Sequence, residues 1–193
     1  MDHATPHPTP VSRASRTRSI AYVGLTIAVL AVSAWVTVPF GPVPFTLQTF
    51  AIVFALLALS PKESIAAIAG YLVLGAIGLP VFSGMRGGIG MLAGPTGGFL
   101  WGFLAGVALA ALLLAAVRRR GFAIEFAAGA VAVVVCYACG WAQYMAVMGA
   151  GPVEALLVTV APFVIVDAIK VAAAVAVANA VARATGRTLR AAR

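Results

Sequence analysis

Long runs of apolar residues alternate along this chain with short clusters of proline, glycine and basic residues. Six of these runs are expected to be helical: residues 20–38, 45–60, 64–79, 99–117, 122–148 and 162–182. A helix that crosses the hydrocarbon core of a bilayer needs about 20 predominantly apolar residues, and most of these runs approach that length. The pattern therefore predicts an all-α integral membrane protein with six transmembrane helices.

Polar residues at both ends divide the chain into three predicted parts. Residues 1–19 are proline-rich and basic and are typical of a flexible cytoplasmic tail, whereas residues 183–193 are expected to form a second basic cytoplasmic tail. Residues 20–182 are expected to form the six-helix membrane domain. No short apolar core with a small-residue cleavage site follows residue 19, so we expect no removed signal peptide.

The composition excludes an ordinary soluble domain. Hydrophobic residues make up 63% of the chain and charged residues 9%, whereas about a quarter of the residues of a soluble domain are charged. The formal net charge of +8 could indicate nucleic-acid binding, but the basic residues gather at the ends of the apolar runs rather than in one stripe. We therefore expect no nucleic-acid partner and expect the basic residues to meet membrane lipid.

The basic residues also predict how the chain crosses the membrane, because cytoplasmic segments of membrane proteins carry an excess of Lys and Arg. With both termini cytoplasmic, 11 of the 13 basic residues fall in inner segments: Arg13, Arg16, Arg18, Lys62, Arg118, Arg119, Arg120, Arg183, Arg187, Arg190 and Arg193. Lys170 then lies within a span and Arg86 on the outer side. The expected location is the prokaryotic cytoplasmic membrane, crossed several times.

The segment 81–98 differs from the rest of the chain because it holds seven glycines, Pro95 and the charge of Arg86. Such a segment is not expected to stay helical, and its backbone polar groups cannot face lipid. We expect an outer glycine-rich loop that covers the bundle as a mobile lid. It lacks the Gly-Lys-Ser/Thr ending of a phosphate-binding loop, so we expect no nucleotide site in this chain.

Two charged residues, Asp167 and Lys170, interrupt the last apolar run. Their i, i+3 spacing places both side chains on one face of a helix. Because proline favours the first position of a helix, a start at Pro162 would place them roughly 8 and 12 Å below the outer surface. Ionisable residues at such a depth are costly and usually mark a functional site.

Three interpretations of this pair stay open. It could be a structural ion pair, although buried ion pairs are poor stabilisers. It could belong to a proton relay, although such relays usually have further acids in neighbouring helices and none is expected here. A ligand site would instead use the carboxylate as an acceptor and the ammonium as a cation. Arg86 would then either bind lipid headgroups or meet an anionic group of the ligand.

Other residues also have both a packing and a functional interpretation. Gln48 and Tyr71 are polar groups within apolar runs, where each could be a packing residue or part of a substrate site. Gly24 and Ala28 form a small-x-x-x-small pattern in the first run. Such a pattern favours close helix packing, either within the chain or with a partner membrane protein.

The sequence contains little that could support catalysis or metal binding. No Ser/His/Asp, Cys/His or paired-carboxylate arrangement appears, so we predict no catalytic residues and no enzyme. Cys136 and Cys139 lack further Cys or His ligands nearby to complete a tetrahedral metal site. His3 and His7 lie in the predicted N-terminal tail. We therefore predict no metal site.

Short motifs follow one another along the chain in a characteristic order. They are PVPFTLQTF at residues 42–50, GAIGLPVF at 75–82, GPTGG at 94–98, and Pro162-Phe followed by Asp167 and Lys170. Together they cover most of residues 20–182, and the chain resembles the BioY family on this basis. That family comprises the biotin-specific S components of energy-coupling factor (ECF) vitamin transporters. The two tails show no match.

The resemblance implies a six-helix bundle whose outer substrate pocket is capped by the third loop, with biotin as the ligand. It implies that Asp167 and Lys170 are the functional pair of the last helix. Family members work with a transmembrane coupling subunit and two ATPases, often through an Ala-x-x-x-Ala pattern in the first helix. Here the corresponding residues are Gly24 and Ala28. Some family members lack a dedicated energising module, and the sequence does not distinguish the two cases.

The expected function is therefore a high-affinity biotin-binding subunit for biotin uptake, working with an ECF energising module and without a cofactor. Its expected substrate-binding residues are Asp167, Lys170, Arg86, Gln48 and Tyr71. The alternatives are an S component or carrier for a different small vitamin and a membrane assembly subunit without transport activity. Whether the chain also forms a homo-oligomer is left open.

Overall fold

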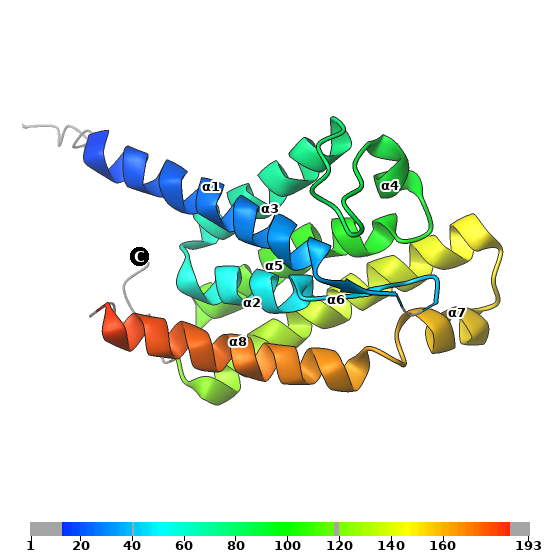
Figure 1. The fold of residues 1–193 in the computed structure, drawn as a ribbon. Helices are drawn as coiled ribbons and strands as arrows, with labels where there is room; N and C mark the ends of the chain where they lie inside the picture. Colours follow the sequence, from blue (N-terminus) through cyan, green and yellow to red (C-terminus); the bar gives the residue numbers. More distant parts are fainter. Residues whose placement is uncertain (1–12, 40, 118–119, 186–193) are drawn as a thin grey trace, which may run out of the picture.

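The computed structural model describes residues 13–39, 41–117 and 120–185. Within them the chain forms eight helices and one small hairpin (Figure 1). The helices are α1 (Arg13–Trp35), α2 (Gln48–Ala58), α3 (Pro61–Ala76), α4 (Ile89–Ala93), α5 (Gly97–Ala116), α6 (Phe122–Met148), α7 (Pro152–Thr159) and α8 (Val164–Ala184). Strands β1 (Thr37–Val38) and β2 (Phe45–Thr46) pair antiparallel. The prediction of a helical membrane protein is confirmed.

Four of the described helices are long and apolar enough to cross a membrane: Ser15–Trp35, Gly97–Ala116, Phe122–Met148 and Val164–Ala184. The apolar helix α2 has 11 residues, about 16 Å at a rise of 1.5 Å per residue, and α3 has 16 residues, about 24 Å. Both are shorter than the ~30 Å hydrocarbon core of a bilayer. The predicted count of six spans is therefore not confirmed.

The ends of the first helix differ from those predicted. Helix α1 already includes Arg13, seven residues before the expected start, and it ends at Trp35. Thr37 and Val38 leave the helix because they pair with β2 across the proline-rich turn. His3, His7 and the last three arginines lie outside the described residues, as do Arg118 and Arg119.

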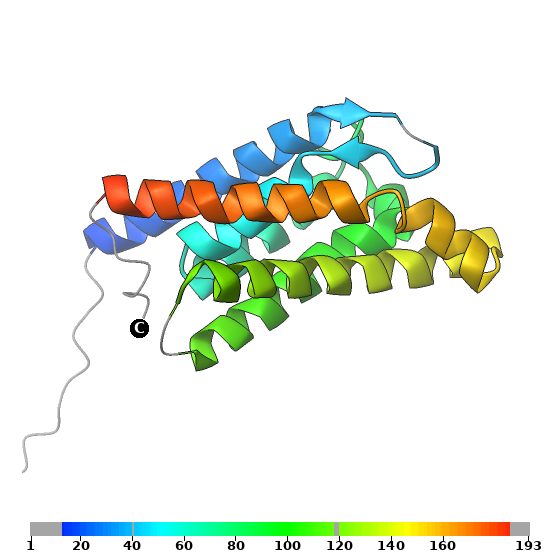
Figure 2. The same cartoon turned by 90° about the horizontal axis from the view of Figure 1, so that it is seen from below.

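The short helix α2 runs through the middle of the bundle. It packs chiefly against α8 and also contacts α1, α5 and α6, and both views show α1 and α8 beside it (Figures 1 and 2). Seven of its 11 residues are buried, including Gln48 at its first position. A polar side chain is thereby carried into the interior of an otherwise apolar bundle.

Three glycines on α5 bring α5 and α6 into direct backbone contact. Gly98, Gly102 and Gly106 are spaced four residues apart, so they lie along one face of the helix. A Cβ atom at Gly102 would lie 2.6 Å from the Cα of Cys136, and at the other two positions it would overlap backbone atoms of α6. Small residues allow helices in membranes to approach this closely.

The glycine-rich segment is partly helical, contrary to the prediction. Residues Ile89–Ala93 form α4, and α5 begins at Gly97. Gln143 of α6 donates hydrogen bonds to the carbonyl oxygens of Leu92 and Gly94, both at 2.8 Å. Its side chain therefore supplies partners for backbone groups at the end of α4, which lets this short helix form beside α5 and α6.

The start of α1 and the end of α8 lie at the opposite end of the bundle from the hairpin (Figures 1 and 2). In Figures 1 and 2, α1 begins and α8 ends at one end, where α5 also ends and α6 begins. The β1–β2 hairpin, α7 and the start of α8 lie at the other end. The hairpin meets the chain at the start of α8 through the rings of Phe45 and Phe163, the residue before α8, whose centroids are 4.4 Å apart.

Candidate ligand-binding site

A cavity lies at the end of the bundle that carries the hairpin. It is bounded by the hairpin, α2, α5, α6, α8 and the segment between α3 and α5, and its volume is about 90 Å³. A single buried water needs about 10–15 Å³ on the same scale, so the space can hold a larger group. The apolar part of its wall includes Ile52, Phe99, Phe103 and Phe163.

The charged pair of α8 lies in the wall of this cavity. Lys170 Nζ is 2.8 Å from Asp167 Oδ1, and the two side chains are 13% and 6% exposed. Asp167 lies in the first turn of α8, where the positive end of the helix dipole favours a carboxylate. The predicted placement of both side chains on one helix face is confirmed.

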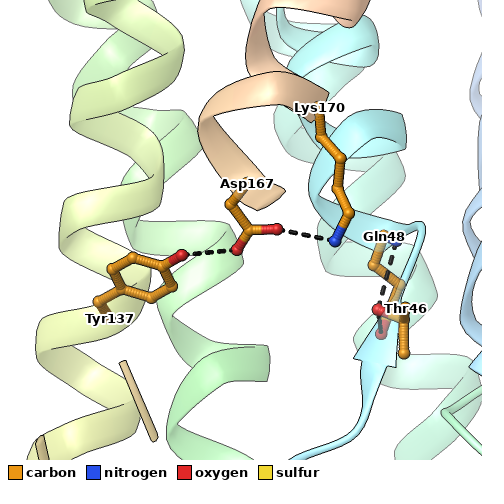
Figure 3. A network of polar contacts seen from close by, with 5 residues as sticks. All are labelled: Thr46, Gln48, Tyr137, Asp167 and Lys170. Carbon is orange, nitrogen blue, oxygen red and sulfur yellow. Dashed lines mark hydrogen bonds and ion pairs between the residues drawn. The ribbon is translucent and has the colours of Figure 1, made fainter. Parts of the chain in front are cut away.

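A tyrosine from α6 completes this polar cluster. Tyr137 donates a 2.7 Å hydrogen bond from its hydroxyl to Asp167 Oδ2, so the carboxylate lies between a phenol and an ammonium (Figure 3). Sequence reasoning missed Tyr137 because its hydroxyl meets Asp167 only through the antiparallel packing of α6 and α8. Its polar hydroxyl within a long apolar run was the available signal.

A second polar group faces the cavity from the hairpin and α2. Thr46 Oγ1 lies 3.2 Å from Gln48 Oε1 and accepts a hydrogen bond from the Gln48 backbone N–H at 3.3 Å. Both residues line the cavity, and Figure 3 shows them on the Lys170 side of the Asp167 carboxylate. The predicted site residue Gln48 therefore lies in the same cavity as Asp167 and Lys170.

The two other predicted substrate residues lie elsewhere. Tyr71 is 1% exposed and does not line the cavity, but it accepts a 2.9 Å hydrogen bond from Gln48 Nε2. Arg86 is exposed and also lies outside the described lining, although Ser83 of the same segment belongs to it. The structure therefore does not bring Arg86 to the charged pair.

The small-x-x-x-small pattern of α1 faces outwards. Gly24 and Ala28 are both exposed, and nothing lies within 4 Å of a Cβ atom built at Gly24. Packing within this chain therefore does not explain the glycine. An interface with a partner stays a prediction.

A second buried acid contradicts the expectation that neighbouring helices carry none. Glu125 of α6 is 2% exposed, and its Oε2 accepts a 2.6 Å hydrogen bond from Asn179 Nδ2 of α8. It does not line the cavity. The sequence already contained this acid near the start of the fifth apolar run, but only the structure shows that it is buried.

The cavity combines an apolar wall with a few polar groups that converge on one side. Asp167 has two oxygens that together can accept about four hydrogen bonds, and Lys170 can donate three. Tyr137 and Lys170 each occupy one acceptor position on a different oxygen of Asp167, and this pairing uses one donor of the ammonium. The cluster can therefore bind a small molecule that has N–H donors, an acceptor and an apolar body.

Comparison with known proteins finds a matching family and similar transporters. The family model described as the BioY family matches residues 6–187. The biotin transporter BioY of Thermotoga maritima is 42% identical over 123 residues, which cover 64% of this chain and 72% of that protein. The probable biotin transporter BioY of Pyrococcus horikoshii is 35% identical over 164 residues, covering 85% and 96%.

The fold has a solved counterpart. The crystal structure of the S-component for biotin from an ECF-type ABC transporter matches with a TM-score of 0.82 and 22% sequence identity, over 90% of this chain and 95% of that chain. That similarity shows the fold alone. Because the family model and the Pyrococcus horikoshii relative both cover most of the sequence, the chain belongs to the BioY family.

Proposed function

We propose that this protein is the biotin-binding membrane subunit of a biotin uptake system and not an enzyme. The observation that carries the proposal is the polar cluster of Tyr137, buried Asp167 and Lys170 in the wall of an apolar cavity. Family membership supplies the identity of the ligand, since the relatives are biotin transporters.

The chemistry of biotin suits this cavity. Its ureido ring has two N–H donors and one oxygen acceptor, and its bicyclic body is apolar. Asp167 would accept from the ureido N–H groups, and Lys170 would donate to the ureido oxygen or to the carboxylate. Thr46 and Gln48 offer polar atoms on the Lys170 side of Asp167. Arg86, outside the lining, would attract the carboxylate from the mouth of the site.

The orientation in the membrane forms part of the proposal. Both termini would be cytoplasmic, and the cavity would open towards the outer side. Helix α1 starts and α8 ends at the end of the bundle opposite the hairpin, which supports this arrangement because the cavity lies at the hairpin end (Figures 1 and 2). In it, α2 and α3 would complete a six-helix bundle although they are too short to span the core by themselves.

The energising partner would be an ECF coupling subunit with two ATPases. The exposed Gly24 and Ala28 of α1 provide a surface on which another helix could approach closely. The fold shared with the S-component of an ECF-type transporter supports this assignment.

A titration of the detergent-purified chain with labelled biotin tests the function. Competition with unlabelled biotin, biotinamide, riboflavin and thiamine would identify the recognised groups. We expect biotin to compete fully, and biotinamide to compete more weakly if the carboxylate is recognised by a cation. Riboflavin and thiamine should not compete. Absence of biotin binding by folded protein, or full displacement by another vitamin, would refute the proposal.

A further inference from the structure

We propose that Tyr71 is a positioning residue for the ligand site. Through Val81, its hydroxyl holds the adjoining cavity wall, formed by Phe82 and Ser83, against the start of α2 and thereby slows the loss of bound ligand. This role rests on the proposed function, because it takes the cavity as the biotin site. It replaces the expectation that Tyr71 touches the substrate.

The hydroxyl of Tyr71 joins two parts of the chain that both reach the cavity. It accepts a 2.9 Å hydrogen bond from Gln48 Nε2 at the start of α2 and donates a 2.9 Å hydrogen bond to the carbonyl oxygen of Val81. Gln48 lines the cavity, as does Phe82 beside Val81. A phenol has one donor and can accept, so a single hydroxyl serves both partners.

The ring of Tyr71 also forms part of the socket that holds Phe82. The side chain of Phe82 is 0% exposed, and its ring meets that of Tyr71 edge to face, with centroids 5.4 Å apart and planes at 77°. One helical turn further along α3, a Cβ atom on Gly75 would overlap the Phe82 ring. The absence of a side chain at Gly75 therefore leaves the space that Phe82 fills.

Other contacts hold the ends of the same segment without touching the cavity. Gly88 donates its N–H to the Gly75 carbonyl at 2.7 Å, and Trp35 Nε1 donates to the Pro80 carbonyl at 2.8 Å. Between these contacts, residues 84–86 are exposed. The two ends of this segment, near residues 80–82 and 88, are therefore hydrogen-bonded to the bundle, whereas its middle, residues 84–86, is exposed. We call the two bonded ends the base of the segment, and Tyr71 links this base to Gln48.

This arrangement predicts an effect on ligand release rather than on ligand chemistry. Phe82 and Ser83 belong to the wall, so a looser base would let that wall move away from the ligand more often. Replacing Tyr71 with Phe removes both hydrogen bonds of the hydroxyl and keeps the ring. We expect the dissociation rate of biotin to rise ~3–10-fold, as for the loss of one ordinary hydrogen bond, because of the two bonds only the one to Val81 holds this wall, and we expect little change in the association rate.

The experiment compares Tyr71→Phe with Tyr144→Phe in the full-length, detergent-purified protein. Tyr144 is buried in α6 but does not line the cavity. Tyr144→Phe is therefore the matched control, because it also removes a hydroxyl from a buried tyrosine. Dissociation of labelled biotin is followed after a chase with unlabelled biotin. Hydrogen–deuterium exchange of residues 79–88 is measured in ligand-free protein, and melting temperature reports general damage.

Faster dissociation and faster exchange of residues 79–88 in Tyr71→Phe, but not in Tyr144→Phe, would support the positioning role. Wild-type rates in Tyr71→Phe, or equal changes in both variants, would overturn it. Gly75→Ala provides a second route if Tyr71→Phe does not fold, because it displaces Phe82 while keeping the hydroxyl, and unchanged dissociation there would also overturn the role. If wild-type protein binds no biotin, the proposed function fails, but exchange in ligand-free protein still decides whether Tyr71 fastens the segment.

Discussion

The helices α6 and α8 are joined by polar side chains at two levels, of which one lines the ligand cavity and the other does not. We call the bond from Tyr137 to Asp167 the cavity contact and the bond from Asn179 to Glu125 the closed contact. On each helix the two levels are twelve residues apart, about 18 Å along the axis. Both acids are buried, with 5% and 2% exposure.

The two contacts differ in what surrounds them. At the cavity contact, Asp167 also pairs with Lys170 and borders a space that can admit another molecule. At the closed contact, Asn179 Nδ2 donates to both Glu125 and the Val175 carbonyl, and no cavity described here reaches it. A buried acid in a membrane helix therefore indicates a ligand site only when its spare acceptors face a space.

The substitution Asp167→Asn, at the cavity contact, should reduce biotin affinity more than any other change considered. It removes the charge that pairs with Lys170 and leaves a partly buried ammonium without its counterion, and such a loss typically costs ~2–5 kcal/mol of binding. Biotin affinity measured by titration should fall correspondingly, by about 30-fold or more. Glu154→Gln on the exposed first turn of α7 is the control, and it should bind like wild type. Near-normal binding by Asp167→Asn would remove this acid from the site.

The variant Tyr137→Phe should have the next largest effect. It deletes one hydrogen bond to a charged group, a change worth ~1.5–3 kcal/mol, while Lys170 still pairs with Asp167. Affinity for biotin should drop at least about tenfold, measured by the same titration. If Tyr137→Phe bound biotin as tightly as wild type, Tyr137 would hold α6 and α8 together without orienting the carboxylate for the ligand.

Breaking the closed contact should change stability instead of binding. In Glu125→Ala the partly buried Asn179 amide loses one of its two hydrogen-bond partners and keeps the Val175 carbonyl, and we expect a cost of ~1–3 kcal/mol of folding free energy. We expect a lower melting temperature in detergent and biotin affinity within about twofold of wild type. An exposed acid again supplies the control, since Glu154→Ala should alter neither quantity. A large loss of affinity at an unchanged melting temperature would show that the two contacts are not separate.

The smallest effect is expected at Arg86. Because it is exposed and lies outside the described lining, its charge would act at long range on an approaching carboxylate. Arg86→Ala should slow biotin association a few-fold at low salt and less at high salt, whereas Arg86→Lys should stay near wild type. A loss of affinity as large as that of Asp167→Asn would place Arg86 in direct contact with the ligand.

The sequence predicted those features that depend on local spacing. The apolar runs gave the helices, and the i, i+3 spacing gave the shared orientation of Asp167 and Lys170, which the structure confirms. The ends of α1 were less predictable, because Thr37 and Val38 join the hairpin through pairing with residues nine and seven positions away.

The remaining site features depend on which helices become neighbours. Tyr137 and Asp167 are 30 residues apart, so no local pattern pairs them. Tyr71 and Gln48 stood out as polar residues in apolar runs, but their bond and its continuation to Val81 required the packing of α2, α3 and the following segment. Glycine was interpreted as flexibility in residues 81–98, whereas Gly97 and Gly98 serve close packing.

The glycine seam between α5 and α6 restricts how the cavity wall can deform. Where backbones touch at Gly102 and its neighbours, no side chain can change rotamer to absorb a shift. By contrast, the walls from α8, the hairpin and residues 82–83 meet the cavity through side chains, among them those of Lys170, Thr46 and Phe82. We therefore expect α5 and α6 to stay fixed relative to each other. Any widening of the cavity that admits a ligand must come from movement of α8, the hairpin or residues 82–83.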